Sequence, residues 1–283
     1  MKLILRGLVV VSSLTVLTSI AQAEPDIVPD VVYGHKHGMA LTLDVFKPTD
    51  ANGAGVLFMV SGGWNSRWYP PQLALGLFRP LLEKGFTVFA VRHGSSPKYK
   101  IPEIVEDVRR SVRFVRTEAD RFGVDAERLG VFGGSAGGHL SLMLASTADE
   151  GKPDSSDNTQ KTTNRVAAVV AYFPPTDLRG LVNDPPNDNK RFPALNFSPD
   201  KAVDYSPIAH VSPDDPPTLL IHGDKDDLVP LRHSTSLLEA LQKHEIDSEL
   251  IVIEGAGHGF EGDDRDQATQ AMVTWFEKHL GGK

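Results

Sequence analysis

Short apolar runs alternate with amphipathic stretches along most of the chain, and this pattern predicts strands and helices in turn. Continuous apolar runs, as expected of strands buried on both faces, lie at 56–60, 87–91, 129–132, 166–172, 218–221 and 249–253. Apolar residues at helical spacing lie at 72–84, 101–122, 136–148, 231–243 and 266–280. Alternation of this kind predicts an α/β fold, with a mostly parallel central sheet and helices on both faces.

Three segments depart from this alternation. Residues 31–33 and 41–46 alternate apolar with polar side chains and are separated by Gly38, which predicts a short antiparallel N-terminal hairpin. Residues 151–164 are polar and predict a surface loop or a flexible insertion. Residues 174–217 are rich in Pro, Asp and Asn, and two interpretations stay open: a lid or substrate-binding insertion, or a solvated excursion without a role.

The helix predicted at 101–122 has a basic side opposite its apolar stripe. Four arginines make up that side: Arg109, Arg110, Arg113 and Arg116. Because acidic residues are interleaved with them, we predict a solvated helix face rather than a binding patch.

The first 23 residues have the three-part pattern of a secretory signal peptide. Lys2 and Arg6 make the start basic, residues 8–20 are largely apolar, and an Ala-Gln-Ala cleavage site ends at Ala23. The apolar run is shorter than the ~20 residues that a membrane-spanning helix needs. We therefore expect cleavage after Ala23, a secreted or periplasmic protein without stable membrane insertion, and a single domain over residues 24–283.

Charge and cysteine content narrow the function classes. The chain carries 29 Lys and Arg against 37 Asp and Glu, a formal net charge of -8. An acidic protein repels phosphate, so a nucleic acid is not an expected partner. The chain has no cysteine, which excludes disulfides, thiolate metal sites and a cysteine nucleophile.

A glycine-rich turn at 133–138, Gly-Gly-Ser-Ala-Gly-Gly, directly follows the strand predicted at 129–132 and opens the next helix. A nucleophile on a sharp strand-to-helix turn has strained backbone angles and close backbone neighbours. Gly133 and Gly137 remove the Cβ atoms that would clash there. The helix N-terminus also stabilises negative charge, so the turn predicts Ser135 as a catalytic nucleophile.

Later strand ends supply a base and an acid in the chain order Ser, Asp, His. The loop after the strand at 218–221 carries four titratable side chains that bear on catalysis: His222, Asp224, Asp226 and Asp227. His258 follows the strand at 249–253 and is flanked by glycines. Both segments lie at the carboxyl ends of strands, where open α/β sheets bind ligands.

These motifs give the chain a resemblance to the α/β-hydrolase superfamily, in particular its bacterial acetyl-xylan and feruloyl esterase-like branch, which borders the hormone-sensitive-lipase-like esterases. Matching stretches lie at 101–103, 106–108, 122–125, 134–140, 222–223, 226, 229–230 and 257–260. The resemblance implies an α/β-hydrolase fold with Ser135, Asp226 and His258 as the triad, because the family acid is separated by two residues from a Val-Pro pair. Asp177, after the strand at 166–172, is the alternative acid.

The resemblance also implies an oxyanion hole of backbone N–H groups. Ala136, next to the nucleophile, is expected to supply one donor. The second is expected from the loop at 61–64, where the family has His-Gly-Gly-Gly and this chain has Ser-Gly-Gly-Trp. Gly63 and Trp64 are therefore both candidates.

Three further side chains are candidates for substrate contact. Trp64 and Trp68 belong to an aromatic group beside the oxyanion loop, and His93 stands at a strand end. Ordinary packing is the alternative for the tryptophans, and a hydrogen-bonded structural role is the alternative for His93. His139, on the helix behind the nucleophile, is expected to be a packed core residue.

Together these features predict a secreted serine esterase that needs no metal or organic cofactor. By analogy with the family, its substrates are short acyl esters, with acetyl or feruloyl groups on polysaccharide as the examples. Two alternatives stay open: an exopeptidase similar to the prolyl oligopeptidase catalytic domain, and a hydrolase-fold binding module without catalysis.

Overall fold

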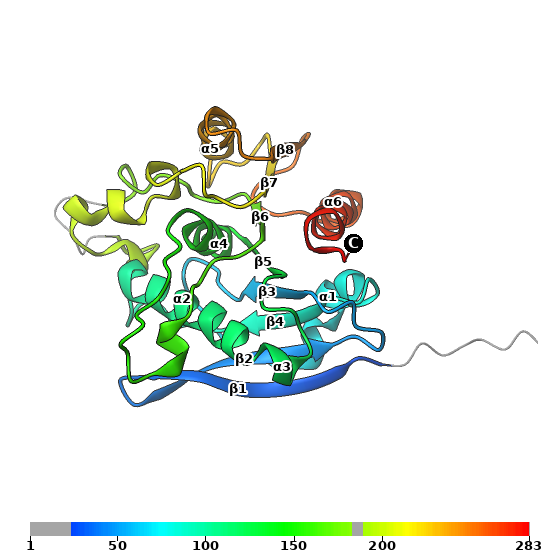
Figure 1. Cartoon of the computed structure of the whole chain (residues 1–283). Helices are drawn as coiled ribbons and strands as arrows, with labels where there is room; N and C mark the ends of the chain where they lie inside the picture. Colours follow the sequence, from blue (N-terminus) through cyan, green and yellow to red (C-terminus); the bar gives the residue numbers. More distant parts are fainter. Residues whose placement is uncertain (1–23, 183–188, 283) are drawn as a thin grey trace, which may run out of the picture.

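An eight-stranded sheet forms the centre of the molecule in the computed structural model, which describes residues 24–182 and 189–282 (Figure 1). The strand order is β1-β2-β4-β3-β5-β6-β7-β8. The strands are β1 (Asp26–Lys36), β2 (Met39–Lys47), β3 (Gly55–Met59), β4 (Thr87–Val91), β5 (Leu129–Gly134), β6 (Ala168–Tyr172), β7 (Thr218–Gly223) and β8 (Ser248–Ile253). β1 and β2 form the predicted antiparallel hairpin, and the strands from β4 to β8 run parallel.

Helices cover both faces of this sheet. They are α1 (Leu75–Leu82), α2 (Ile101–Thr117), α3 (Ala119–Phe122), α4 (Ala136–Ser146), α5 (Arg232–Lys243) and α6 (Gly262–Leu280). α1 and α6 pack on one face, and α2, α4 and α5 pack on the other (Figure 1). The predicted fold class, an α/β-hydrolase sheet with an N-terminal hairpin, is confirmed.

Two predicted helices are divided in the structure. The one expected at 72–84 begins as a 3₁₀ turn, Pro71–Ala74, before α1. The one expected at 101–122 breaks at Glu118, whose φ of -100° and ψ of 18° leave the helical region. The Thr117 hydroxyl donates to the Arg113 carbonyl at 2.8 Å, a contact that bends helices and accompanies this break.

The basic side of α2 is covered rather than solvated, so that prediction was wrong. The polar segment after α4 folds back over it. Arg110 Nη1 donates to Asp157 Oδ2 at 2.5 Å, and Arg113 Nε donates to the Thr162 carbonyl at 2.9 Å while its Nη2 pairs with Asp149. Each polar group satisfies the other's hydrogen-bonding need, which holds the 151–164 segment to the helix.

The segment at 174–217 contributes to the core in its described part. It contains four short 3₁₀ turns, Pro193–Leu195, Pro199–Lys201, Val203–Tyr205 and Pro207–Ala209, joined by irregular backbone. Leu178, Ala194 and Leu195 are buried in the same cluster as α2 and α4. These three side chains therefore attach the described part of the segment to the core.

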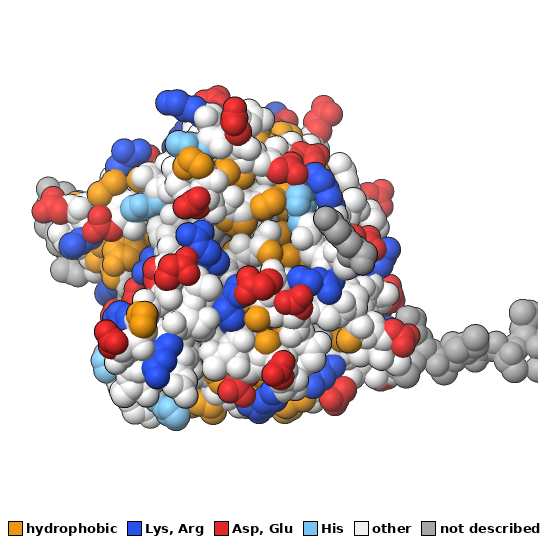
Figure 2. All heavy atoms as spheres, viewed as in Figure 1, with side chains coloured by type: hydrophobic (Ala, Val, Ile, Leu, Met, Phe, Trp, Pro, Cys, Tyr) orange, Lys and Arg blue, Asp and Glu red, His pale blue; other side chains and the backbone are white. Residues whose placement is uncertain are grey.

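The predicted signal peptide at 1–23 lies outside the described residues. Among the residues that are described, no helix has both the length and the apolarity required to cross a membrane. Acidic and basic side chains are mixed across the face shown in Figure 2.

Candidate active site

The turn between β5 and α4 holds Ser135 in a strained conformation. Its φ of 53° and ψ of -119° are rare for a residue with a Cβ. A Cβ on Gly133 would lie 2.5 Å from the Gly137 carbonyl carbon, and a Cβ on Gly137 would lie 2.7 Å from the Met59 carbonyl oxygen. Both contacts are with backbone that cannot yield, so the glycines permit the turn as the sequence predicts.

His258 joins Ser135 to Asp226. Its Nε2 lies 2.9 Å from Ser135 Oγ and its Nδ1 lies 2.7 Å from Asp226 Oδ2. A carboxylate accepts from Nδ1–H, so Nε2 is left as the acceptor for the serine hydroxyl. The side chain of His258 is 20% exposed and that of Asp226 is fully buried, so the imidazole is accessible from solvent while the carboxylate is not.

The Asp226 carboxylate is held by four neighbouring groups. Its Oδ1 accepts from the backbone N–H groups of Leu228 and Val229 at 2.9 and 2.8 Å. Besides His258, its Oδ2 lies 3.2 Å from Nε2 of His222, a buried ring that also contacts the Val229 carbonyl at 2.7 Å. Burial lowers the pKa of His222. These contacts fix the carboxylate in one orientation toward His258.

The other candidate acids serve different partners. Asp177 forms a two-point ion pair with Arg179 at 2.8 and 2.6 Å, and this hydrogen bonding lowers its pKa. Asp224 Oδ1 accepts from the Gly255 N–H at 2.6 Å, and Asp227 is exposed. Among the described residues considered as acids, Asp226 is the one that contacts His258.

The loop after β3 makes a tight turn beside Ser135. Gly62 and Asn65 exchange backbone hydrogen bonds at 3.1 and 3.0 Å, and the residues between them, Gly63 and Trp64, have φ of 56° and 57°. Within the described part of the chain, the N–H groups of Gly63 and Trp64 make no backbone hydrogen bond. They are therefore free to bind a ligand oxygen, as is the N–H of Ala136 in the first turn of α4.

A pocket of about 80 Å³ opens at Ser135. Its walls are formed by Gly63, Trp64, Pro175, Leu181, Asn189, Phe192, Leu195, Leu228 and Val229. Most of these side chains are apolar, so the pocket suits a small apolar group attached to the serine oxygen.

Comparison with known proteins identifies the family. The BD-FAE family model matches residues 43–241. The chain belongs to the BD-FAE family.

Relatives of this BD-FAE chain are named esterases. The probable carboxylic ester hydrolase LipM of Mycobacterium tuberculosis is 28% identical over 233 residues, which cover 76% of this chain and 51% of LipM. The chain thus spans about half the length of the curated relatives it matches.

Solved structures of similar shape are also esterases. A truncated carbohydrate esterase from gut microbiota is 26% identical with a TM-score of 0.76, covering 93% of this chain and 99% of that one. Thermogutta terrifontis esterase 2, phosphoramylated by tabun, is 25% identical with a TM-score of 0.73, covering 92% and 96%.

Two of the predicted substrate-contacting residues of the BD-FAE chain lie outside the pocket at Ser135. Trp68 is 59% exposed, and its indole N–H donates to Asp30 at 3.1 Å. His93 is buried, with Nδ1 2.9 Å from the Gly94 carbonyl and Nε2 unpartnered among the described residues. Desolvation lowers the pKa of His93 to about 4. Of the three candidates, Trp64 alone lines the pocket.

Five pocket residues come from the irregular segment and were missed by sequence reasoning: Pro175, Leu181, Asn189, Phe192 and Leu195. The segment itself was recognised, but it has no periodicity from which inward-facing positions can be read. The signal available was the apolar side chains within a polar stretch.

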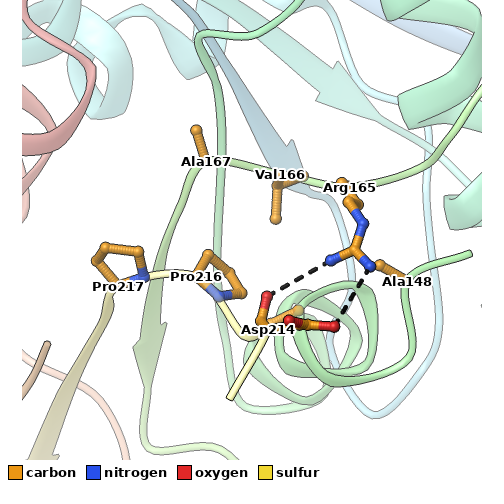
Figure 3. Close-up of a pocket in the computed structure, with 8 residues that line it drawn as sticks. Ala148, Arg165, Val166, Ala167, Asp214, Pro216 and Pro217 are labelled. Atoms are coloured by element: carbon orange, nitrogen blue, oxygen red, sulfur yellow. Dashed lines mark hydrogen bonds and ion pairs between the residues drawn. The ribbon is translucent and has the colours of Figure 1, made fainter. Parts of the chain in front are cut away.

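A second pocket, of about 180 Å³, lies at the amino ends of β6 and β7, on the sheet edge opposite Ser135 (Figure 3). Its charged groups pair with one another, because Arg165 Nη1 lies 3.5 Å from the Asp214 carbonyl and Nη2 lies 3.9 Å from its carboxylate (Figure 3). Arg165 also donates to Glu150 at 2.8 Å. The residues that line this pocket include no serine and no histidine.

Proposed function

We propose that this protein is a serine esterase in which Ser135 is the nucleophile, His258 the base and Asp226 the acid that orients the base. The observation that carries the proposal is the continuous hydrogen-bonded chain from Ser135 Oγ through His258 to the buried Asp226 carboxylate. Its position at a strained strand-to-helix turn and the esterase names of relatives and structural neighbours support the same conclusion.

The reaction is acyl transfer in two steps. His258 Nε2 takes the proton of Ser135 as Oγ attacks the ester carbonyl, and returns it to the departing alcohol. Water then attacks the acyl-enzyme as His258 accepts its proton, and His258 returns that proton to Ser135 Oγ as the carboxylic acid leaves. Asp226 keeps the useful tautomer and stabilises the imidazolium ion.

Backbone N–H groups stabilise the negative oxygen of each tetrahedral intermediate. Ala136 supplies one donor from the first turn of α4, and Gly63 or Trp64 supplies the other from the loop after β3. Groups fixed in this way bind the charge without reorganising as it develops.

The proposed substrate is an ester with a small acyl group. The pocket of about 80 Å³ at Ser135 is small and lined mainly by apolar side chains, which supports a short acyl group. Acetyl is the example of such a group that we propose. The alcohol portion lies outside the pocket, and the carbohydrate esterase among the structural neighbours supports an acetylated carbohydrate.

We also propose that the protein is exported, with cleavage after Ala23. The support is the basic, apolar and small-residue order of the leader. Intact mass measurement of the protein recovered from the periplasm or medium tests it, because an uncleaved chain there would contradict the proposal.

A substrate panel tests the function. It compares p-nitrophenyl acetate, butyrate and octanoate, acetylated xylan, methyl ferulate and an aminoacyl anilide. We expect the acetyl esters to have the highest kcat/KM, and Ser135→Ala to lower kcat by a factor of about 10³–10⁶. Turnover of the anilide alone, or near-normal turnover by folded Ser135→Ala, would contradict the proposal.

A further inference from the structure

His139 connects three parts of the site. Its ring lies behind the nucleophile turn on α4, and its backbone N–H donates to the Ser135 carbonyl at 2.9 Å. Nδ1 lies 3.2 Å from the indole Nε1 of Trp64, in the loop after β3. Nε2 lies 2.8 Å from the carbonyl oxygen of Tyr205, in the segment that also supplies pocket residues. One buried ring thus bridges two loops and the nucleophile helix.

The protonation of this ring is determined by its partners. An indole N–H is a donor only and a carbonyl is an acceptor only. His139 Nδ1 must therefore accept from Trp64, while Nε2 carries the proton and donates to Tyr205. The side chain is fully buried, and burial lowers its pKa to about 4, so the neutral ring keeps this arrangement at neutral pH.

Trp64 needs such support. Its φ of 57° is uncommon for a residue with a Cβ, and this conformation persists only where the surroundings hold it. Its indole is held at one end by His139, with the two rings edge-on at 5.5 Å and 79°. The ring of Phe192 packs against the indole at 6.2 Å and 84°, and the Trp64 carbonyl accepts from the Ser96 N–H at 3.0 Å.

We propose that His139 is a positioning residue for the proposed esterase reaction, on which this inference rests. Through Trp64, its ring holds the loop after β3 that carries the Gly63 and Trp64 N–H groups. Through Tyr205, it ties the 174–217 segment to α4. The Gly63 and Trp64 donors belong to the loop after β3, whereas the Ala136 donor belongs to the first turn of α4. The His139 ring sets their spacing, and that spacing is what a tetrahedral oxyanion requires.

Trp64→Phe is the most selective variant for testing this, because it removes the indole N–H and keeps an aromatic side chain. His139→Leu removes both ring contacts, and His139→Gln offers an amide that can accept and donate in their place. Trp275→Phe is the matched control, since the Trp275 indole N–H is buried in α6 without a partner among the described residues.

We expect Trp64→Phe and His139→Leu each to lower kcat for p-nitrophenyl acetate about tenfold, with KM changed less than threefold. The kcat of the Trp64→Phe, His139→Leu double variant should be at most about twofold lower than that of the less active single variant. Both changes break the same hydrogen bond, so their effects should not add. His139→Gln should recover most of the activity, and Trp275→Phe should match the wild type.

A second measurement does not depend on turnover. The chain has three tryptophans, so an NMR spectrum of the indole N–H groups has three resonances, and Trp64→Phe assigns one of them. That resonance should shift and exchange faster with solvent in His139→Leu and return toward its wild-type behaviour in His139→Gln, while the other two stay in place. If His139→Leu does not fold, the Trp64→Phe and His139→Gln variants carry the test.

The outcomes separate this inference from the proposed function. Three results would overturn the role of His139: wild-type kcat in folded Trp64→Phe, additive losses of kcat in the double variant, or a Trp64 resonance that does not move in His139→Leu. In each case Ser135→Ala would still abolish turnover. A lower kcat/KM that comes only from a higher KM would also overturn the role of His139. A wild-type protein without esterase activity would overturn both proposals.

Discussion

The His258 Nε2 atom lies 2.9 Å from Ser135 Oγ, although 123 positions separate the two residues in the chain. Ser135 follows β5 and His258 follows β8, with β6 and β7 between those strands in the sheet. Parallel strands bring all their carboxyl ends to one edge, so loops distant in sequence meet there. The ring of Phe173, 4.7 Å from that of His258, packs on the base from the end of β6.

Replacement of the buried acid should be far more damaging than replacement of the alternative acid. Asp226→Asn should lower kcat by a factor of about 10⁴. This is the loss that follows in a serine protease triad when the acid is changed to Asn and the histidine is held in the wrong tautomer. Asp177→Asn removes only a surface-side pairing with Arg179 and should leave kcat within about twofold. Steady-state kinetics of both variants, with circular dichroism to confirm folding, decide the matter. A larger loss of kcat in Asp177→Asn than in Asp226→Asn would show that Asp226 is not the acid of the triad.

The glycines of the nucleophile turn should resist the smallest substitution. Gly133→Ala and Gly137→Ala each place a Cβ within 2.7 Å of backbone atoms, so we expect a loss of at least about 1–3 kcal/mol in the free energy of unfolding. Gly76→Ala is the control. Gly76 lies exposed in α1 with nothing within 4 Å of an added Cβ, and alanine there should stabilise by about 0.5–1 kcal/mol. Urea unfolding measures all three, and equal stability of the three variants would contradict the account.

The sequence predicted the features that depend on residues near one another in the chain, namely the strands and the turn at Ser135. Continuous apolar runs located the parallel strands, because a strand buried on both faces needs no polar positions. The spacing of Gly133, Ser135 and Gly137 indicated the nucleophile turn, because close backbone contacts at such a turn leave no room for a Cβ. The order of the acid and the base along the chain then followed from strand ends.

Features that depend on distant partners were not predictable in the same way. The arginines of α2 look the same in sequence whether water or a polar segment covers them, and here Asp149 and Asp157 cover them. The role of Phe192 depends on how an irregular segment folds over Trp64. Gly63 and Trp64 both have positive φ and N–H groups without a backbone partner among the described residues, so both stay candidates for the second oxyanion donor.

Phe192 should limit the length of the acyl group. Its ring closes the pocket at Ser135 and packs edge-on against Trp64. Phe192→Ala should raise kcat/KM for p-nitrophenyl octanoate relative to acetate by about tenfold, since each added methylene that gains a place in an apolar pocket is worth about 10-fold or more. Phe114→Ala, a partly buried phenylalanine on α2, is the control and should leave the ratio unchanged. An unchanged ratio in Phe192→Ala would show that the acyl group binds elsewhere.

Acid should destabilise the fold through its buried histidines. His93 and His139 have pKa values lowered from 6.5 to about 4 by burial, so between these values the unfolded chain binds protons that the folded chain does not. The free energy of unfolding should therefore fall as pH drops from 6.5 toward 4, by at most about 3 kcal/mol for each histidine. Below pH 4 these two residues contribute no further loss.

Urea unfolding at pH 7 and at pH 4.5 measures this dependence. His93→Gln removes one of the two titrating groups, so its stability should fall less between the two pH values than that of the wild type. An equal fall in both proteins would show that His93 does not titrate as its burial implies.

The most direct test of the proposed nucleophile is covalent labelling with a fluorophosphonate, followed by mass spectrometry of the tryptic peptides. We predict one adduct, on Ser135, that is absent from Ser135→Ala and forms much more slowly in Asp226→Asn. A folded wild-type protein that stays unlabelled, or that carries the adduct on a different residue, would contradict it.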